Sequence, residues 1–327
     1  MTSPESSAPA STSVPDVSVI VPCRDAAAWI AETISSVIEQ RGTTCELIVV
    51  DDGSTDESAD TAEAMGARVL RCLPRGVSAA RNEGTAIAAG RYIQYLDADD
   101  VLEPGTLAER VDLADRTGVD VVLVAWRQWT RERSGEFAAG EVFRRRLSAR
   151  ADVSLLTNAW WPPGAVFYRR AIVDRIGAWR ADLPIIQDAR FLLDAALAGA
   201  SFDYLDNVGL KYRIHGPTSL SRRDPRAFVE DCYRSAAELH DRWQKDNTLD
   251  PPRRDALVVV LGYVARAIFP LDRGRFDEVL ERIHTLDPKY RPEAPVLLRK
   301  LSGAIGYRSA EQVALWWRQL KGLARPQ

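Results

Sequence analysis

Two groups of aspartates stand directly behind two short apolar runs of the chain. Asp51-Asp52-Gly53-Ser54 follows Leu47–Val50, and Asp97-Ala98-Asp99-Asp100 follows Tyr92–Leu96. Carboxylates at the carboxyl ends of parallel strands border the crevice in which open α/β sheets bind ligands. Such oxygens suit Mg²⁺ or Mn²⁺, which share their remaining sites with substrate phosphates. The alternative at each cluster is that the aspartates cap the following turn or helix.

Alternating apolar runs and helix-like segments surround these clusters and must position them. Strand-like runs are predicted at 17–22, 47–50, 67–70 and 92–96, and helices at 26–40, 56–65 and 78–89. Regular alternation of this kind predicts a doubly wound, mostly parallel sheet with right-handed crossovers. The first hundred residues therefore predict an α/β fold that binds a nucleotide.

The pattern continues less regularly beyond Asp100. A helix is expected at 105–116 and a strand at 119–126, whereas the charged, weakly periodic stretch 128–151 predicts hairpins or loops. Further strands are expected at 165–168, 202–205 and 208–214, and helices at 170–176 and 188–198. From residue 225 the sequence is helical throughout and is punctuated by prolines.

Composition limits the classes of protein that fit. The 327 residues carry 43 Lys and Arg against 46 Asp and Glu, so no excess of positive charge argues for a nucleic-acid partner. The four cysteines lack metal-type spacing and indicate reduced thiols in a cytosolic protein. The first 14 residues, rich in Ser, Ala, Thr and Pro, predict a disordered tail rather than a secretion signal.

Four motifs occur in order along the chain: Val17–Pro22, Asp51–Asp56, Gly76–Gly84 and Tyr95–Asp100. Together they resemble the family 2 glycosyltransferases with the GT-A fold. The resemblance implies an α/β, Rossmann-like, mixed but mostly parallel sheet with a C-terminal helical appendage. It divides the chain into a tail at 1–14, a catalytic domain at 15–224 and a helical region at 225–327.

The resemblance also implies a nucleotide-sugar site. Pro22 and Arg24 would flank the base, and Asp52 would accept the uracil imide N–H. Arg81 would lie near the diphosphate or the base, on a helix whose first N–H groups are open to an anion. The alternative for Arg81 is a solvated arginine on a helix surface. The expected donor is a UDP-sugar, and a dTDP-sugar would satisfy the same imide contact.

The second acidic cluster would hold the metal. Asp99 is expected to be the principal ligand of Mn²⁺ or Mg²⁺, and Asp97 to contact the ribose or the ion. The ion would offset the charge that develops on the departing nucleoside diphosphate.

A third carboxylate is expected to move the proton. Many relatives carry Glu-Asp before an aromatic at the start of a helix, and this chain has Gln187-Asp188 within Leu183–Phe191. The aspartate that acts as general base in the family is retained as Asp188, and the helix dipole would favour its ionised form. Plain capping of the helix by Asp188 is the alternative. The implied reaction is single displacement with inversion at the anomeric carbon.

Two further groups belong to the expected site. Arg213, His215 and Ser219 lie in Tyr212–Ser221, which resembles a bacterial Tyr-Arg-x-His…Ser loop, and would contact the diphosphate or complete the metal shell. A surface histidine in a turn is the alternative. Trp160 and Trp161 stack on a sugar or acceptor, or else they are buried in the core.

The expected activity is that of a hexosyl- or N-acetylhexosaminyltransferase in the biosynthesis of a bacterial glycan or natural product. The sequence does not select among a glycan, a lipid-linked, a peptide or a small-molecule acceptor. A nucleotidyltransferase is a rival, although Cys23–Ala26 is not the Gly-rich basic loop expected there. A non-catalytic nucleotide- or carbohydrate-binding module on the same fold is the other rival.

The C-terminal segment Leu315–Lys321 is basic and aromatic. It packs on the catalytic domain or on another copy of the chain, or it lies on a membrane surface. The apolar stretch 256–265 is too short to span a bilayer. We therefore expect a cytoplasmic protein, with the inner face of the membrane as the site of any peripheral contact.

Overall fold

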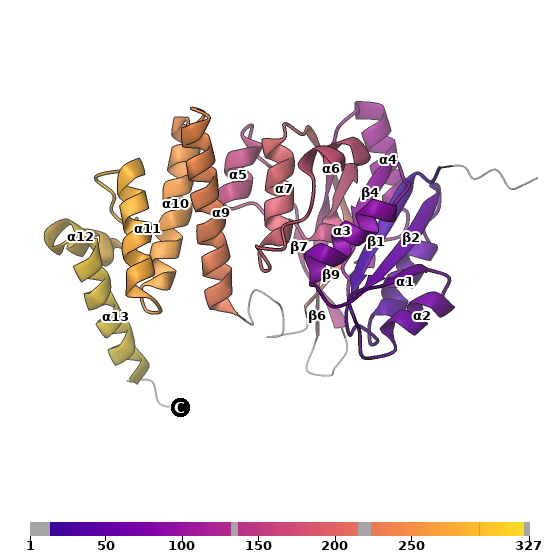
Figure 1. The fold of residues 1–327 in the computed structure, drawn as a ribbon, viewed down its shortest axis with the longest axis horizontal. Helices are drawn as coiled ribbons and strands as arrows, with labels where there is room; N and C mark the ends of the chain where they lie inside the picture. The colour runs from indigo at the N-terminus through magenta and orange to yellow at the C-terminus, as the bar shows by residue number, and fades with distance from the viewer. Residues whose placement is uncertain (1–13, 132–136, 215–223, 294, 324–327) are drawn as a thin grey trace, which may run out of the picture. The chain divides into compact units, whose positions relative to one another are not determined.

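The computed structural model describes residues 14–131, 137–214, 224–293 and 295–323 (Figure 1). Its internal contacts divide the chain into two compact units. Unit 1 consists of the chain up to residue 145 together with 161–181 and 198–214, and unit 2 consists of 146–160, 182–197 and the chain from 215 onward. Unit 2 thus combines the C-terminal helices, which begin at Pro225, with two earlier segments of the chain.

Unit 1 is built on one mixed sheet. Its strands are β1 (Val17–Cys23), β2 (Cys45–Asp51), β3 (Arg68–Arg71), β4 (Tyr92–Tyr95), β5 (Val101–Leu102), β6 (Val121–Arg131), β7 (Phe137–Phe143), β8 (Val166–Arg169) and β9 (Phe202–Ile214). The helical segments of this unit are α1 (Ile30–Ile38), α2 (Ser58–Ala64), α3 (Val77–Ile87), α4 (Thr106–Thr117), η1 (Pro163–Ala165) and α6 (Arg170–Ile176).

The strand order is β3-β2-β1-β4-β8-β6-β9-β5, with β7 paired to β6. β1 to β4, β6 and β9 point in one direction, whereas β5, β7 and β8 run the opposite way. The predicted mixed, mostly parallel α/β sheet is therefore confirmed. Right-handed crossovers in this order place α1 and α2 on one face of the sheet and α3 on the other.

α3 packs closely on β1 and β2, and Gly84 makes this approach possible (Figure 1). A Cβ atom at Gly84 would lie 2.5 Å from Cγ2 of Ile20 and 3.1 Å from Cγ2 of Val50. Every residue of β1 is buried, as expected of a strand covered on both faces. This contact fixes the helix that carries Arg81 against the centre of the sheet.

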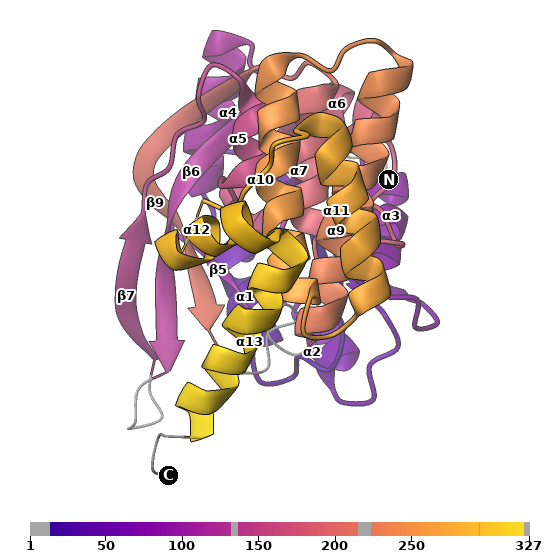
Figure 2. The ribbon, with the colours of Figure 1, turned by 90° about the vertical axis from the view of Figure 1, so that its left-hand side faces the viewer.

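The second half of the sheet differs in detail from the sequence prediction. Figure 2 shows β6, β7 and β9 side by side, so part of the stretch predicted as hairpins or loops is indeed a hairpin strand. The predictions of strand at 202–205 and 208–214 are confirmed, but the break predicted between them is wrong, because β9 is one continuous strand. Register shifts opposite Val124 and Ala125 absorb the polar Asp206-Asn207 step without ending the ladder.

Unit 2 is helical. It contains α5 (Ala151–Thr157), α7 (Gln187–Leu197), α9 (Pro225–Lys245), α10 (Pro251–Ile268), α11 (Arg273–Leu286), α12 (Val296–Ile305) and α13 (Tyr307–Leu323). α9, α10 and α11 are each preceded by an aspartate whose side chain accepts a backbone N–H of the first turn: Asp224, Asp250 and Asp272. Among the helices of the described ranges, none combines the length and apolar character needed to cross a bilayer.

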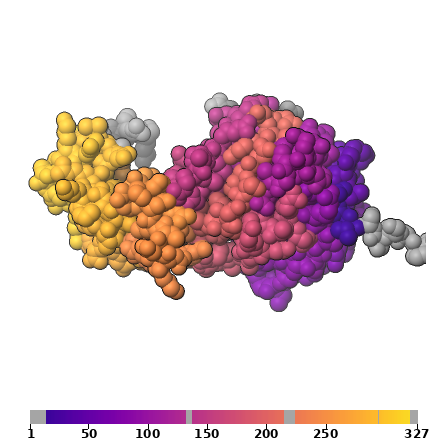
Figure 3. Space-filling model, turned by 90° about the horizontal axis from the view of Figure 1, so that it is seen from above, coloured from indigo at the N-terminus to yellow at the C-terminus, as the bar shows by residue number. Residues whose placement is uncertain are grey.

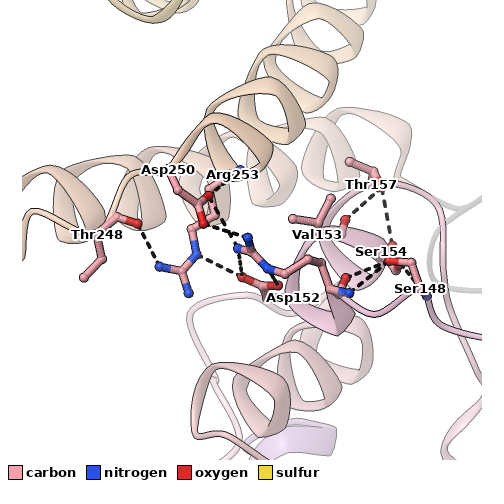
Figure 4. A network of polar contacts seen from close by, with 9 residues as sticks. Ser148, Asp152, Val153, Ser154, Thr157, Thr248, Asp250 and Arg253 are labelled. Carbon is pink, nitrogen blue, oxygen red and sulfur yellow. Dashed lines mark hydrogen bonds and ion pairs between the residues drawn. The ribbon is translucent and has the colours of Figure 1, made fainter.

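A network of ion pairs ties α5 to the start of α10 (Figure 4). Arg150 donates to both carboxylate oxygens of Asp152, at 3.0 and 2.9 Å, and its Nη1 lies 2.6 Å from Oδ2 of Asp250. Arg253 Nε donates to the same Asp152 carboxylate at 2.9 Å, and the Arg253 guanidinium lies 4.8 Å from the Trp243 ring centre. These contacts explain why α5 belongs with the C-terminal helices.

Candidate functional site

The carboxyl ends of β1 and β2 meet at a turn organised by Asp52. Its backbone N–H donates to the Cys23 carbonyl at 2.8 Å. Its side chain is buried, with Oδ1 accepting from Arg75 N–H at 2.7 Å and Oδ2 accepting from Gly76 N–H at 2.9 Å. Gly76 has a φ of +91° and precedes the first residue of α3. Asp52 thus anchors the N-terminus of the helix that carries Arg81.

The predicted base-binding residues Pro22, Arg24 and Asp52 lie together at this edge. Pro22 is buried in β1 opposite Val50, and Nη1 of Arg24 lies 3.8 Å from Oδ2 of Asp52. The Arg24 side chain is 54% exposed, so it is accessible to a ligand. Each oxygen of Asp52 takes one backbone N–H and retains a second lone pair as a hydrogen-bond acceptor.

Asp25, beside Arg24, stiffens the same turn. It adopts a φ of +48°, which is uncommon for a residue with a side chain. Its Oδ1 accepts from Thr55 N–H at 2.7 Å, and its own N–H donates to Ser54 Oγ at 3.0 Å. The loops after β1 and β2 are therefore bonded to each other and not only to their own strands.

Arg81 is not a solvated helix arginine. Its side chain is 2% exposed, its Nη2 lies 2.6 Å from Oδ1 of Asp97, and its guanidinium stands 4.3 Å from the Trp179 ring centre. This geometry joins the third and fourth sequence motifs in space. It places a delocalised cation next to the first carboxylate of the Asp97–Asp100 cluster.

Sequence reasoning missed Trp179 and the residue that holds it. Asn82 donates from Nδ2 to the Trp179 carbonyl at 3.1 Å and accepts from Trp179 N–H at 2.8 Å. The Trp179 ring also packs edge-on against Tyr95, with centroids 4.7 Å apart. Since Asn82 and Trp179 are 97 residues apart, no local sequence pattern predicts that they are in contact. One feature of the sequence could have indicated the contact: Asn82 is a polar residue next to Arg81 on a helix that is predicted to pack on a sheet.

The Asp97–Asp100 cluster forms a turn in which the three carboxylates have different surroundings. Asp97 and Asp99 are partly exposed, whereas Asp100 is fully buried and its Oδ1 accepts from Arg213 N–H at 2.9 Å. Burial, followed by the nearby carboxylates of Asp99 and Asp97, raises the pKa of Asp100 well above its ordinary value. Oδ2 of Asp100 is buried and has no hydrogen-bond partner among the described residues. Three carboxyl groups are thus crowded at this turn, and the neutral form is favoured at the buried one, Asp100.

The donor chemistry of this turn fits a divalent cation that a diphosphate helps to hold. Within the part of the chain that the structure describes, no three Asp, Glu, His or Cys side chains are arranged to bind a metal by themselves. Mg²⁺ and Mn²⁺ are commonly held by one or two carboxylates together with substrate phosphates and water. Asp99 and Asp97 supply that number, and the crowded carboxylates provide the electrostatic reason for a cation.

Arg213 lies in a different setting from the one expected. Its side chain is 2% exposed, and its Nη2 lies 2.6 Å from Oε2 of Glu32 on α1. Its guanidinium stands 4.7 to 5.0 Å from three ring centres: those of Trp29, Trp129 and Phe137. These contacts hold the end of β9 to α1 and to the β6–β7 hairpin. His215 and Ser219 lie outside the described residues.

Asp188 lies in the first turn of α7, in unit 2. Its Oδ2 accepts from Trp160 Nε1–H at 2.9 Å and its Oδ1 from Ala189 N–H at 2.8 Å. The two adjacent tryptophans have separate environments, because Trp161 is 2% exposed and its ring centre lies 6.0 Å from that of Trp126 in unit 1. The alternatives for this pair were stacking on a sugar or acceptor and burial in the core. Trp161 is buried, whereas the indole of Trp160 contacts the carboxylate of Asp188.

α7 is anchored by buried polar contacts within unit 2. Arg190 is 3% exposed on its side chain and bonds Asp194 at 2.9 Å and Glu238 at 2.6 Å. Just before the helix, Ile185 N–H donates to Oδ2 of Asp231 at 2.8 Å. The position of Asp188 within this unit is therefore fixed by α9, which carries both Asp231 and Glu238.

The model of the family described as Glycosyl transferase family 2 matches residues 18–177, which include the Asp52 turn, Arg81 and the Asp97–Asp100 cluster. The chain belongs to this family. Because the members of this family are glycosyltransferases, the protein is an enzyme. The match therefore argues against both rival classes, the nucleotidyltransferase and the non-catalytic binding module.

Relatives of this family 2 glycosyltransferase come from several bacteria. It is 26% identical over 237 residues to the uncharacterized glycosyltransferase EpsJ of Bacillus subtilis, covering 69% of this chain and 67% of EpsJ. It is 35% identical over 119 residues to the succinoglycan biosynthesis protein ExoO of Rhizobium meliloti, covering 35% of this chain and 34% of ExoO. The chain therefore spans about a third of the length of ExoO.

Solved structures support the GT-A fold over nearly the whole chain. The crystal structure of S. aureus TarS 1–349 superimposes with a TM-score of 0.58 at 20% identity, covering 93% of this chain and 91% of that one. A crystal structure of the same protein in complex with UDP-GlcNAc gives a TM-score of 0.57 at 18% identity, covering 93% and 92%.

Proposed function

We propose that this glycosyltransferase transfers a hexosyl or N-acetylhexosaminyl group from a UDP-sugar to an acceptor, with inversion at the anomeric carbon. The observation that carries the proposal is the buried Arg81–Asp97 pair beside Asp99, at the same sheet edge as Asp52. The complex of TarS with UDP-GlcNAc supports a uridine nucleotide as the donor. A dTDP-sugar presents the same imide and is the second donor to test.

Donor recognition would begin at the Asp52 turn. The second lone pair of an Asp52 oxygen accepts the imide N–H of uracil, while Pro22 and Arg24 border the base. Arg81 lies next to Asp97 and contributes positive charge towards the diphosphate. Mn²⁺ or Mg²⁺ held by Asp99 and Asp97 would neutralise the charge that develops on the leaving diphosphate.

Proton transfer is assigned to Asp188. Its carboxylate removes a proton from the acceptor, the acceptor oxygen or nitrogen attacks the anomeric carbon from the face opposite the diphosphate, and the bond to the diphosphate breaks. An α-linked donor therefore gives a β-linked product without a covalent sugar–enzyme intermediate. The indole N–H of Trp160 and the backbone N–H of Ala189 orient the two oxygens of Asp188, and a remaining lone pair of the carboxylate takes the proton of the acceptor.

The experiment measures UDP release from a panel of UDP-sugars with Mn²⁺ and candidate acceptors, for the unchanged chain, Asp188→Asn and a control, Asp174→Asn. Asp174 is an exposed carboxylate on α6 and should be neutral. Asp188→Asn should lower transfer about a hundredfold or more, the usual share of a general base, while keeping the thermal shift produced by UDP. If Asp188→Asn transferred the sugar at the unchanged rate, Asp188 would not be the general base. Absence of any thermal shift with UDP or dTDP would contradict the proposal that the donor is a UDP-sugar or a dTDP-sugar.

A further inference from the structure

The helices α12 and α13 leave an unusual number of large apolar side chains exposed. Thirteen large hydrophobic residues are exposed in the described ranges, and seven of them are on these two helices: Val296, Leu297, Ile305, Val313, Trp316, Trp317 and Leu320. Trp316 is 58% and Trp317 57% exposed, although tryptophan is usually buried. Both tryptophans of the basic, aromatic segment identified in the sequence therefore keep more than half of their surface exposed.

The exposed charged side chains of the same helices are basic, although Arg308 pairs with Asp277 of α11 at 2.7 Å. Residues 296–323 contain five basic residues and one acidic residue, Glu311. Glu311 is fully buried and pairs with Arg318 at 3.2 Å, whereas Arg299 and Lys300 are exposed. The side chains of α12 and α13 thus combine exposed apolar rings with positive charge. Figure 3 draws these two helices in yellow. That combination is typical of a helix lying at the interface of an anionic bilayer.

A cavity of about 540 Å³ opens beside these side chains. It is lined on one side by Phe269 and Arg273 and on the other by residues of α12 and α13, including Ile305, Gln312 and Trp316. The wall is apolar at Phe269, Ile305 and Trp316, so an acyl or glycerol stem finds partners there. The cavity therefore suits a ligand with an apolar stem.

The polar end of the cavity is set by Arg273. Its guanidinium stacks on Phe269 at 3.5 Å from the ring centre, and its Nη2 donates to Gln312 Oε1 at 3.0 Å. Its Nη1 is shielded from solvent and finds no hydrogen-bond acceptor among the described residues. Because arginine has only donors, the missing partner must be an acceptor, and an anionic oxygen suits it best.

We propose that α12 and α13 form a docking surface for an anionic lipid bilayer, and that the cavity beside Arg273 receives the phosphate of one lipid. The exposed tryptophans enter the headgroup region, and the basic side chains face the lipid phosphates. The helices would lie on the bilayer, in keeping with the lack of a spanning helix in the described part of the chain. A symmetric dimer through this face is disfavoured, since it would bring two basic surfaces together.

Vesicle flotation of the full chain tests the proposal, with phosphatidylcholine vesicles compared with vesicles that also contain phosphatidylglycerol. The unchanged chain should float with the anionic vesicles, and flotation should weaken as salt is raised. The double variant Trp316→Ser/Trp317→Ser should bind about tenfold or more weakly. Arg273→Gln should bind about fivefold more weakly, the share of one basic side chain near such a surface.

Two matched controls separate this surface from general effects of charge and apolarity. Arg116→Gln on α4 removes an exposed arginine, and Leu73→Ser removes a leucine that is 81% exposed; neither should change flotation. Far-UV circular dichroism and the UDP thermal shift report whether each variant is folded, and the double tryptophan variant loses no buried side chain. Equal binding to neutral and anionic vesicles, or unchanged binding of that double variant, would overturn the proposal. A dimer in light scattering that the same variant dissociates would overturn it in favour of a second copy.

Discussion

Nη2 of Arg81 lies 2.6 Å from Oδ1 of Asp97, and the arginine side chain is 2% exposed while that of the aspartate is 30% exposed. A buried guanidinium needs an anion, because removing it from water is costly without one. Asp97 therefore has a structural role in addition to any contact with a ligand. Asp99, two residues further, is the carboxylate on which metal binding should depend most.

The two aspartates should accordingly respond differently to replacement by asparagine. Asp97→Asn removes the carboxylate charge that lies 2.6 Å from the buried Arg81 guanidinium and should lower the free energy of unfolding by about 3 kcal/mol. Asp99→Asn should change it by less than about 1 kcal/mol, as for a partly exposed carboxylate, but should abolish the Mn²⁺-dependent part of the UDP thermal shift. Urea unfolding and thermal shift with and without Mn²⁺ measure both effects. Equal stability of the two variants would contradict the structural role of Asp97.

Base selectivity should follow from the acceptor character of Asp52. Uracil offers an imide N–H to a carboxylate, whereas the ring nitrogen of cytosine at that position is an acceptor. With CDP, the Asp52 carboxylate and the cytosine ring nitrogen would be two acceptors facing each other without a donor. Because such a buried contact costs more free energy than one hydrogen bond contributes, we expect UDP to bind about tenfold or more tightly than CDP. Isothermal titration calorimetry of both nucleotides with Mn²⁺ measures the ratio. Comparable affinities would assign Asp52 solely to anchoring the Arg75 and Gly76 amides.

Trp160 should tune the proposed base. Trp160→Phe removes the indole N–H that bonds Oδ2 of Asp188, and loss of a donor to a carboxylate disfavours its ionised form. We expect kcat to fall several-fold and the acidic limb of its pH profile to move to higher pH. Trp161→Phe is the matched control: its ring lies in the core, so it should lower stability and leave the pH profile in place. A profile unaltered by Trp160→Phe would argue against the orienting role.

Acid should weaken unit 2 through Asp152. Burial raises the pKa of Asp152, but hydrogen bonds from Arg150 and Arg253 outweigh it and lower the pKa to about 2. A folded-state pKa below the ordinary value of 3.8 stabilises the fold above about pH 4, and this contribution is lost as the pH falls towards 2. Asp152→Asn should therefore cost about 2 kcal/mol at neutral pH and much less near pH 2. Urea unfolding of both chains across this range measures the difference, and a cost that does not vary with pH would contradict it.

The contact of α3 with the sheet should not tolerate a methyl group. Gly84→Ala would bring a Cβ to 2.5 Å from Cγ2 of Ile20, so the helix must shift, at a cost of about 1–3 kcal/mol. Gly274→Ala, on α11, is the control: its Cβ would lie 3.5 Å from Oδ1 of Asp272 and alanine favours a helix, so stability should be unchanged or slightly higher. Similar urea midpoints for the two variants would contradict the close packing at Gly84.

Much of the fold was predictable because local patterns determine it. The apolar runs of β1, β2 and β4 and the helix periodicity between them predict a parallel sheet, and the ordered motifs around Asp52, Arg81 and Asp97 predict the family. The break expected within β9 was wrong, because the polar dipeptide Asp206-Asn207 is locally typical of a turn. Pairing with the long strand β6 kept the chain extended there.

By itself, the sequence determined which chemical groups are available and near which strand ends they stand, because strand and helix patterns are local. Only the tertiary structure decided their partners, because these depend on contacts between residues far apart in the chain. Arg81 meets Asp97 and Trp179, Arg213 is enclosed by aromatic rings beside Glu32, and Trp160 bonds Asp188 while its neighbour Trp161 is buried. Burial and pairing of this kind arise only when distant segments pack, so no spacing within one segment predicts them.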